Sequence, residues 1–128
     1  MPARTPDELH GLFTRHFSAG DLDGLLALYE AGAVLYPQPG LAAVGTAAIR
    51  DALDAFLALH GTFTMTTGRV IRTDALALIF APWTLVATGP DGKPMILSGT
   101  ATDVVRQQAD GTWRFAIDNP FGAEGVGA

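Results

Sequence analysis

Apolar residues recur at helical spacing three times within the first 60 residues of the chain. The first stretch follows Thr5-Pro6-Asp7-Glu8, where Thr5 can cap a helix, Pro6 suits its first turn and Glu8 completes a capping box. Its apolar stripe consists of Leu9, Leu12, Phe13, His16 and Phe17. We therefore predict a helix over residues 5–20.

A second helix is predicted to begin at Asp21 and to end near Gly32, which suits a left-handed C-terminal cap. Its buried side is expected to consist of Leu22, Leu25, Leu26 and Tyr29. A short strand over residues 34–36 follows and ends at Pro37 and Pro39. A loop then leads to Thr46, which can cap a third helix.

The third helix has an apolar face of Ile49, Leu53, Phe56 and Leu57. After His60-Gly61 the pattern changes to alternation, in segments rich in Thr, Val, Ile and aromatic residues. These segments are residues 62–72, 75–88, 95–106 and 112–119, and the turns between them are Thr73-Asp74, Pro90-Asp91-Gly92 and Asp110-Gly111.

The resulting order is α-α-β-α-β-β-β-β, which indicates an α+β fold. We expect a curved, mainly antiparallel sheet wrapped on three N-terminal helices as an open-ended cone. The 128 residues suit a single domain, and the Gly- and Ala-rich residues 122–128 are expected to form a flexible tail.

Composition narrows the range of partners. The net charge of −5 and the absence of any run of Lys or Arg argue against nucleic acid and anionic membranes. No segment approaches the roughly 18 apolar residues of a membrane helix, and the N-terminus does not resemble a signal peptide, so we expect a cytoplasmic protein. The chain has no cysteine and no HExxH-like spacing, so neither a metal nor another cofactor is expected.

Several short motifs are distributed over almost the whole chain. Residues 20–25, 33–34 and 45–50 (GDLDGL, AV and GTAAIR) are similar to the first half of ketosteroid isomerase. The last of them, DGTWR at 110–114 with DNPFG at 118–122, are similar to SnoaL-like proteins. The chain thus resembles the nuclear transport factor 2-like superfamily, and the resemblance implies the cone fold. It does not imply one activity, because the superfamily includes isomerases, cyclases, dehydratases, epoxide hydrolases and non-catalytic binders.

Most of the catalytic residues that the resemblance would imply are replaced in this chain. The isomerase's catalytic tyrosine falls on Phe13 and its general-base aspartate on Pro37, and neither residue can exchange a proton. The oxyanion-hole aspartate falls on Asp103. Related epoxide hydrolases carry Arg-x-Asp where this chain has Ala101-Thr102-Asp103. Neither the isomerase mechanism nor the epoxide hydrolase mechanism is therefore expected.

Asp103 is the candidate catalytic residue on physical grounds as well. Strand side chains alternate between faces, which places Asp103 with Met95, Leu97, Ala101 and Val105. Burial on this apolar face should raise the pKa of its carboxyl group and suit it to act as acid or base. The alternative is a structural aspartate that is hydrogen-bonded to its neighbours.

Alternation along residues 113–121 places Trp113, Phe115 and Asn119 in one row and Asp118 opposite. We therefore expect Asn119 to face the pocket, and Asp118 to pair with Arg114 or to lie at an interface. The same segment can also simply end the strand, because Pro120 cannot donate to a sheet.

We expect a pocket lined by aromatic and polar side chains of the helices and strands. The candidate ligand-binding residues are Phe13, His16, Phe17, Tyr36, Phe56, Trp83, Asp103, Ile117, Asn119 and Phe121. His16 is placed at the pocket mouth, with a partly exposed helix residue as the alternative, and the facing of Trp83 is ambiguous because it follows Pro82. His10 and His60 are the weaker histidine candidates.

Three functions remain open at this point. The first is a pocket for a small, largely apolar molecule, with isomerase-, cyclase- or dehydratase-like proton transfer by Asp103. The second is a non-catalytic binding or dimerisation module, and the third is a macromolecular adaptor. The half-polar sheet face rich in Thr is expected to form a homodimer.

Overall fold

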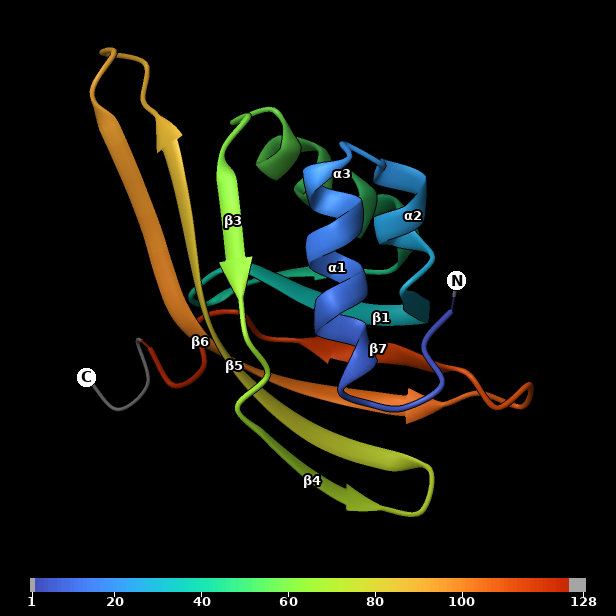
Figure 1. Ribbon diagram of the computed structural model, residues 1–128. Coiled ribbons are helices and arrows are strands. Elements are labelled where there is room, and N and C mark those ends of the chain that lie inside the picture. The colour runs from blue at the N-terminus through green and yellow to red at the C-terminus, as the bar shows by residue number, and fades with distance from the viewer. Residues whose placement is uncertain (1, 125–128) are drawn as a thin grey trace.

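The computed structural model describes residues 2–124, and it shows three helices on the inner side of a curved, mixed sheet (Figure 1). The helices are α1 (Glu8–Ser18), α2 (Leu22–Leu26) and α3 (Thr46–Leu57). The strands are β1 (Tyr29–Gln38), β2 (Leu41–Val44), β3 (Thr62–Met65), β4 (Arg69–Thr73), β5 (Leu76–Thr88), β6 (Pro94–Gln107) and β7 (Trp113–Asp118).

Within the described part of the chain, the strands form one open sheet in the order β2-β1-β7-β6-β5-β3, with β4 also paired to β5. The pairing is antiparallel except between β1 and β7, which run parallel. The predicted α+β class and the arrangement of helices and strands are therefore confirmed. The core lies between the helices and the sheet, and its largest buried side chains include Leu9, Ile49, Ile79, Trp113 and Phe115.

The start of α1 differs from the predicted capping box. The helix begins at Glu8, and the Thr5 side chain makes no capping bond. Only half of the box forms, because the Glu8 carboxylate accepts hydrogen bonds from the backbone N–H groups of Arg4 and Thr5 at 2.7 and 2.9 Å. Thr46 likewise lies inside α3, behind Gly45 at the cap position.

The second helix is shorter than predicted, and the strand after it is longer. Tyr29 was expected on the helix, but it begins β1. Gly32 does not end a helix; it lies within β1 at φ +80°, where the pairing of β1 with β7 shifts register. A glycine adopts this conformation without a Cβ clash, so the strand continues through a bulge. The predicted loop after Pro39 contains a further strand, β2.

The predicted strand over residues 62–72 is divided into β3 and β4. Pro82 on the neighbouring β5 explains the break: its carbonyl accepts from Thr66 N, so its missing N–H would have pointed to the same side. Met65 pairs with Trp83 and Arg69 with Phe80, which leaves one extra residue on the β3–β4 side. A bulge therefore separates the two strands.

The end of the described chain is a turn. Gly122 N–H donates to the Asn119 carbonyl and Glu124 N–H to the Phe121 carbonyl, at 3.2 and 3.0 Å. This turn covers the first residues of the predicted flexible tail. Residues 125–128 of that tail lie outside the described residues.

Candidate functional site

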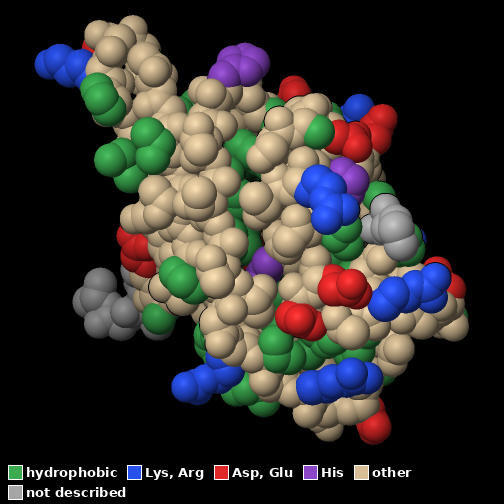
Figure 2. Space-filling view, in the orientation of Figure 1, with side chains coloured by type: hydrophobic (Ala, Val, Ile, Leu, Met, Phe, Trp, Pro, Cys, Tyr) green, Lys and Arg blue, Asp and Glu red, His purple; other side chains and the backbone are tan. Residues whose placement is uncertain are grey.

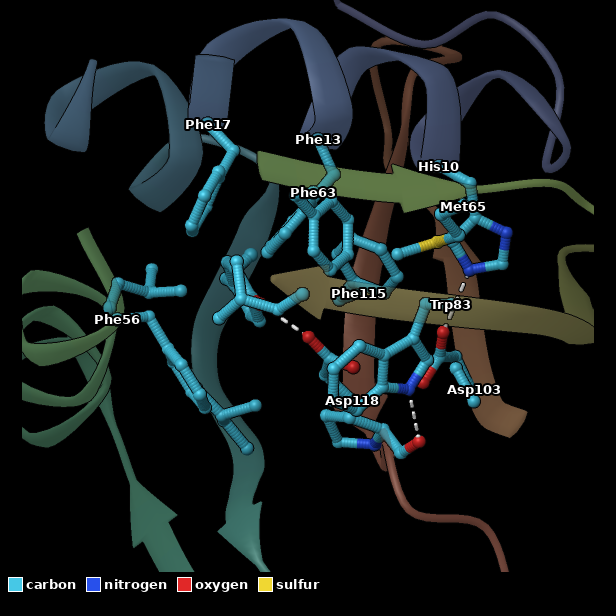
Figure 3. A pocket seen from close by; sticks show the side chains of 16 residues that line it. His10, Phe13, Phe17, Phe56, Phe63, Met65, Trp83, Asp103, Phe115 and Asp118 are labelled. Carbon is cyan, nitrogen blue, oxygen red and sulfur yellow. Dashed lines mark hydrogen bonds and ion pairs between the residues drawn. The ribbon is translucent and has the colours of Figure 1, made fainter. Parts of the chain in front are cut away.

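An apolar cavity lies between the helices and the inner face of the sheet, with a polar group of side chains at one end (Figure 3). Aromatic rings from α1, α3, β1, β3, β5 and β7 form a large part of its wall. It is lined by His10, Phe13, Phe17, Tyr29, Leu35, Leu53, Phe56, Phe63, Met65, Trp83, Leu85, Ala101, Asp103, Phe115, Asp118 and Pro120.

Helix α1 contributes His10, Phe13 and Phe17 to this wall. Their spacing of three and four residues places them on one face of the helix. Phe13 and Phe17 pack around Phe63 of β3, with ring centroids 5.5 and 5.2 Å from it. His10, nearest the start of the helix, instead reaches the polar end and is only 2% exposed.

Asp103 lies on the inner face of β6, as alternation predicts, and is 1% exposed. Its Oδ2 lies 2.8 Å from Nε2 of His10, and its Oδ1 accepts the backbone N–H of Asn119 at 2.8 Å. Burial raises the pKa of Asp103 to about 6, although the Asp118 side chain and the Asn119 N–H oppose the rise. The expected raised pKa is thus present.

Asp118 also faces the cavity, contrary to the sequence prediction. Val105 pairs with Phe115 and Val104 with Ile117, so Ala116 is an extra residue on β7. This bulge shifts the alternation by one position, turning Ile117 outward (42% exposed) and Asp118 inward (6% exposed). The predicted pairing of Asp118 with Arg114 is therefore wrong.

A hydrogen bond joins Asp118 to Tyr29, whose hydroxyl donates to Asp118 Oδ2. Burial and the nearby Asp103 charge raise the pKa of Asp118 well above its usual range. Burial and Asp118 likewise raise the pKa of Tyr29 well above 10. The protonated forms of both side chains are favoured, so the polar end tends to hold one negative charge, on Asp103.

His10 is held in its neutral form. Burial lowers its pKa to about 4, although the Asp118 charge opposes this shift. Its Nδ1 lies 2.9 Å from Oγ1 of Thr67, in the break between β3 and β4. Both ring nitrogens therefore have polar partners, and the buried ring is fully hydrogen-bonded.

Trp83 closes the cavity against the segment that follows β7. Its Nε1–H donates to the Pro120 carbonyl at 2.6 Å, and Phe121 packs against its ring in a T-shaped arrangement, with the ring centroids 5.4 Å apart. Gly99 makes this contact possible, since a Cβ there would lie 2.8 Å from the Pro120 carbonyl oxygen. The ambiguous facing of Trp83 is thereby resolved: its ring lines the cavity.

The predicted ligand-binding residues divide into two groups. Those that line the cavity are Phe13, Phe17, Phe56, Trp83 and Asp103. Those that do not are His16, Tyr36, Ile117, Asn119 and Phe121.

Each residue of the second group lies elsewhere for a local reason. The Nδ1 of His16 is 3.3 Å from the exposed carboxylate of Asp21. Tyr36 lies on the other face of β1 from Leu35, and the bulge turns Ile117 outward. Asn119 contributes its backbone instead, and its side chain donates to the Gly122 carbonyl. Phe121 packs against the Trp83 ring and is not part of the cavity wall.

Sequence reasoning missed His10, Tyr29 and Asp118 as polar site residues. His10 carried a signal, because it precedes Phe13 by three residues and Phe17 by seven. Tyr29 and Asp118 had no such signal, because each lies beside a register shift and strict alternation along a strand does not predict which way it faces. Among residues 2–124, no group of three His, Asp or Glu side chains could hold a metal ion, and no helix is long and apolar enough to cross a membrane.

The sequence matches one known protein family over most of its length. The SnoaL-like domain matches residues 10–116, which include most of α1, most of the sheet and the His10–Asp103 pair. This chain belongs to the SnoaL-like domain family. No curated protein matches this SnoaL-like domain.

Solved structures resemble this SnoaL-like domain in fold at low sequence identity. A ketosteroid isomerase-like protein from Erwinia carotovora atroseptica has a TM-score of 0.75 at 16% identity, with 87% of this chain and 88% of that chain covered. A protein of unknown function from Mycobacterium tuberculosis has a TM-score of 0.75 at 21% identity, covering 87% and 69%. A proposed dehydratase of the NTF2-like family from Streptomyces avermitilis has 0.71 at 16%, covering 87% and 88%. These neighbours share its NTF2-like fold.

Proposed function

We propose that this SnoaL-like domain binds a small, largely apolar molecule in its cavity and catalyses proton transfer on it. The observation that carries the proposal is the set of hydrogen-bonding side chains at one end of an aromatic cavity: His10, Asp103, Asp118 and Tyr29. A ligand with one polar group on an apolar body would match this division of the wall.

The two carboxyl groups support acid–base chemistry because their environments separate their protonation states. With a pKa of about 6, Asp103 is mostly ionised at neutral pH and can accept a proton. Asp118, whose pKa is raised further from its usual range by the neighbouring charge, can donate one. A base and an acid side by side suit an isomerisation, cyclisation or dehydration, in which one proton is removed and another is delivered.

The dimensions of the cavity restrict the ligand. Its free volume is about 40 Å3, which is room for roughly three water molecules. A ring compound therefore requires aromatic side chains to turn aside. Phe13, Phe17 and Phe63 line the cavity and pack against one another, and they are the side chains expected to move.

The second candidate is a binding module without catalysis. Phe13 and Pro37 stand where the resemblance to ketosteroid isomerase would place proton carriers, and this favours it. The two candidates differ in one outcome, which is whether a bound molecule is chemically changed.

The test is a thermal-shift screen of small carbonyl and hydroxyl compounds, followed by product analysis for each compound that raises the melting temperature. We expect hits with the wild-type protein and none with Ala101→Leu, which fills the cavity from its buried wall. Asp103→Asn should still bind these compounds but lose turnover. Full turnover by Asp103→Asn would exclude the catalytic proposal, and binding without turnover by the wild type would support the binding module.

We also propose that the outer sheet face forms a homodimer. Direct strand partners share a face, and one row of partners crosses six strands of the sheet with aliphatic side chains only. The row consists of Ile71, Leu78, Val104, Ile117, Val34 and Val44. Three of these side chains are at least 42% exposed, so the face offers a second copy a continuous apolar strip.

The dimer predicts an effect of charge in this row. Ile117→Glu should convert the protein to a monomer in size-exclusion chromatography with light scattering, because the dimer would bury a carboxylate in the apolar strip. The control is Leu41→Glu, at a similarly exposed position outside the row. A monomeric wild type, or a dimer that survives Ile117→Glu and dissociates with Leu41→Glu, would contradict this interface.

The charged groups elsewhere do not favour another partner. Figure 2 shows acidic and basic side chains interspersed on the visible face, with no basic cluster. Apolar side chains gather on the protruding β5–β6 hairpin, where Val86 and Ile96 are 44% and 65% exposed. These residues lie on the outer side of the sheet and can extend the proposed interface.

A further inference from the structure

The hydrogen of a neutral imidazole can lie on either ring nitrogen, and in His10 the choice determines what Asp103 receives. Nε2 lies 2.8 Å from Asp103 Oδ2, and Nδ1 lies 2.9 Å from Thr67 Oγ1. If Nε2 carries the hydrogen, His10 donates to the Asp103 carboxylate. If Nδ1 carries it, Asp103 must itself be protonated to hydrogen-bond to Nε2.

The position of Thr67 follows from the break in the sheet. Thr67 continues the inward-facing row of Phe63 and Met65 by one step beyond β3, in the break of three residues that faces Ala81 and Pro82. Its half-buried side chain reaches the first turn of α1, where its hydroxyl lies within hydrogen-bonding distance of His10 Nδ1 and of the Asp7 carbonyl. The break therefore places a hydroxyl group beside the first turn of α1, within hydrogen-bonding distance of the His10 side chain.

The Thr67 hydroxyl has one hydrogen and two possible acceptors. The Asp7 carbonyl lies 3.5 Å away, at the end of the hydrogen-bonding range, whereas His10 Nδ1 lies at 2.9 Å. Asp7 is also the N-cap residue of α1, and an N-cap carbonyl already accepts the first bond within its helix. The hydroxyl hydrogen is therefore directed to His10 Nδ1, because this contact is the shorter one and because the Asp7 carbonyl already accepts another hydrogen bond.

The opposite side of the site requires the same arrangement. Asp103 Oδ1 accepts the Asn119 N–H, so one oxygen of the carboxyl group already serves as an acceptor. A donor at Nε2 completes an anion that is held at both oxygens, which a buried carboxylate needs for stability. The other titratable groups here, Asp118 and Tyr29, approach from β7 and β1, and their hydrogen bond joins them to each other and not to the His10 ring.

We propose that Thr67 is a positioning residue that fixes neutral His10 as the Nε2–H tautomer, so that His10 donates to Asp103. Without the Thr67 hydroxyl, Nδ1 has no donor and the ring is free to carry its hydrogen on either nitrogen. The Asp103 carboxylate then receives the Nε2–H hydrogen bond in only part of the molecules, and its ionised form is less stabilised. The catalytic consequence rests on the proposed function, but the tautomer itself does not.

The test is 15N NMR of histidine-labelled protein at pH 7.5, where protonated and unprotonated ring nitrogens resonate far apart. The wild-type protein should show His10 as a single Nε2–H form. Thr67→Val, which removes the hydroxyl at nearly constant volume, should shift the two ring resonances toward each other or exchange them. Thr67→Ser should keep the wild-type shifts, and so should Thr64→Val, the same change at an exposed position of β3.

An Nδ1–H form in the wild type, or unchanged His10 shifts in Thr67→Val, would overturn the assignment. The wild-type spectrum decides this even if Thr67→Val fails to fold. A measurement of ligand turnover distinguishes failure of this inference from failure of the proposed function. A confirmed tautomer in a protein that converts no ligand would leave Thr67 as a positioning residue of a binding site and reject catalysis alone.

Discussion

Replacing His10 by leucine is expected to lower the free energy of unfolding by about 3 kcal/mol at pH 7.5. The change removes the partner of Asp103 Oδ2 and leaves a carboxylate that is 1% exposed with one donor fewer. Leucine has a similar volume, so most of the loss arises from the unsatisfied charge. Urea unfolding followed by tryptophan fluorescence measures it.

Two comparisons distinguish this origin from a packing defect. The loss should shrink at pH 5, below the pKa of about 6 at which Asp103 takes up a proton. The double variant His10→Leu/Asp103→Asn should recover at least half of it, because a neutral amide costs less to bury than a carboxylate. The control His16→Leu, which removes the ion pair with the exposed Asp21, should cost less than about 1 kcal/mol. A loss that is equal at both pH values would indicate packing instead.

The stability of the wild-type protein is expected to fall as the pH rises from 4 to 6.5, because the raised pKa values of Asp103 and Asp118 together outweigh the opposite effect of His10. Asp103 has a raised folded-state pKa of about 6, so its contribution is present below about pH 4 and is lost as the pH rises through 6. His10 has a lowered folded-state pKa of about 4, so its contribution is present above 6.5 and is lost as the pH falls through 4. Each effect amounts to about 3 kcal/mol.

Asp103→Asn should weaken this fall. The variant keeps the rise of stability with pH that His10 causes and lacks the fall that Asp103 causes. Losing the Asp103 charge also lessens the increase in the pKa of Asp118, which burial alone still raises. Between pH 4 and 7 the unfolding midpoint should therefore fall less in the variant than in the wild type. An equal or steeper fall in the variant would contradict the raised pKa of Asp103.

The parts of the fold with regular periodicity were predictable from the sequence. Strands β5 and β6 pair without interruption from Leu76–Arg106 to Thr88–Pro94, and alternation therefore placed Asp103 on the inner face. The three helices also followed their apolar spacing. The glycine and aspartate turns formed where expected, with Asp74, Gly92 and Gly111 at positive φ.

The rest of the site depends on interruptions that periodicity does not contain. Gly32 was interpreted as a helix end, although a glycine at positive φ serves equally well in a bulged strand. Asp118 was assigned to the wrong face because nothing in the sequence marks Ala116 as an extra residue. His10 was underrated because its partner, Asp103, lies 93 positions away, and a single histidine in an apolar stripe has no visible purpose without it.

The extra residue Ala116 has a consequence for comparing sequences of this kind. Deleting it would leave a regular strand in which Phe115 and Asp118 still face inward, because the two positions would then be two apart. The spacing Phe-x-x-Asp in this chain is thus structurally equivalent to Phe-x-Asp in a strand without the bulge. An alignment that forbids gaps inside strands would place this carboxylate one column away from its counterpart and record a conserved site as a lost one.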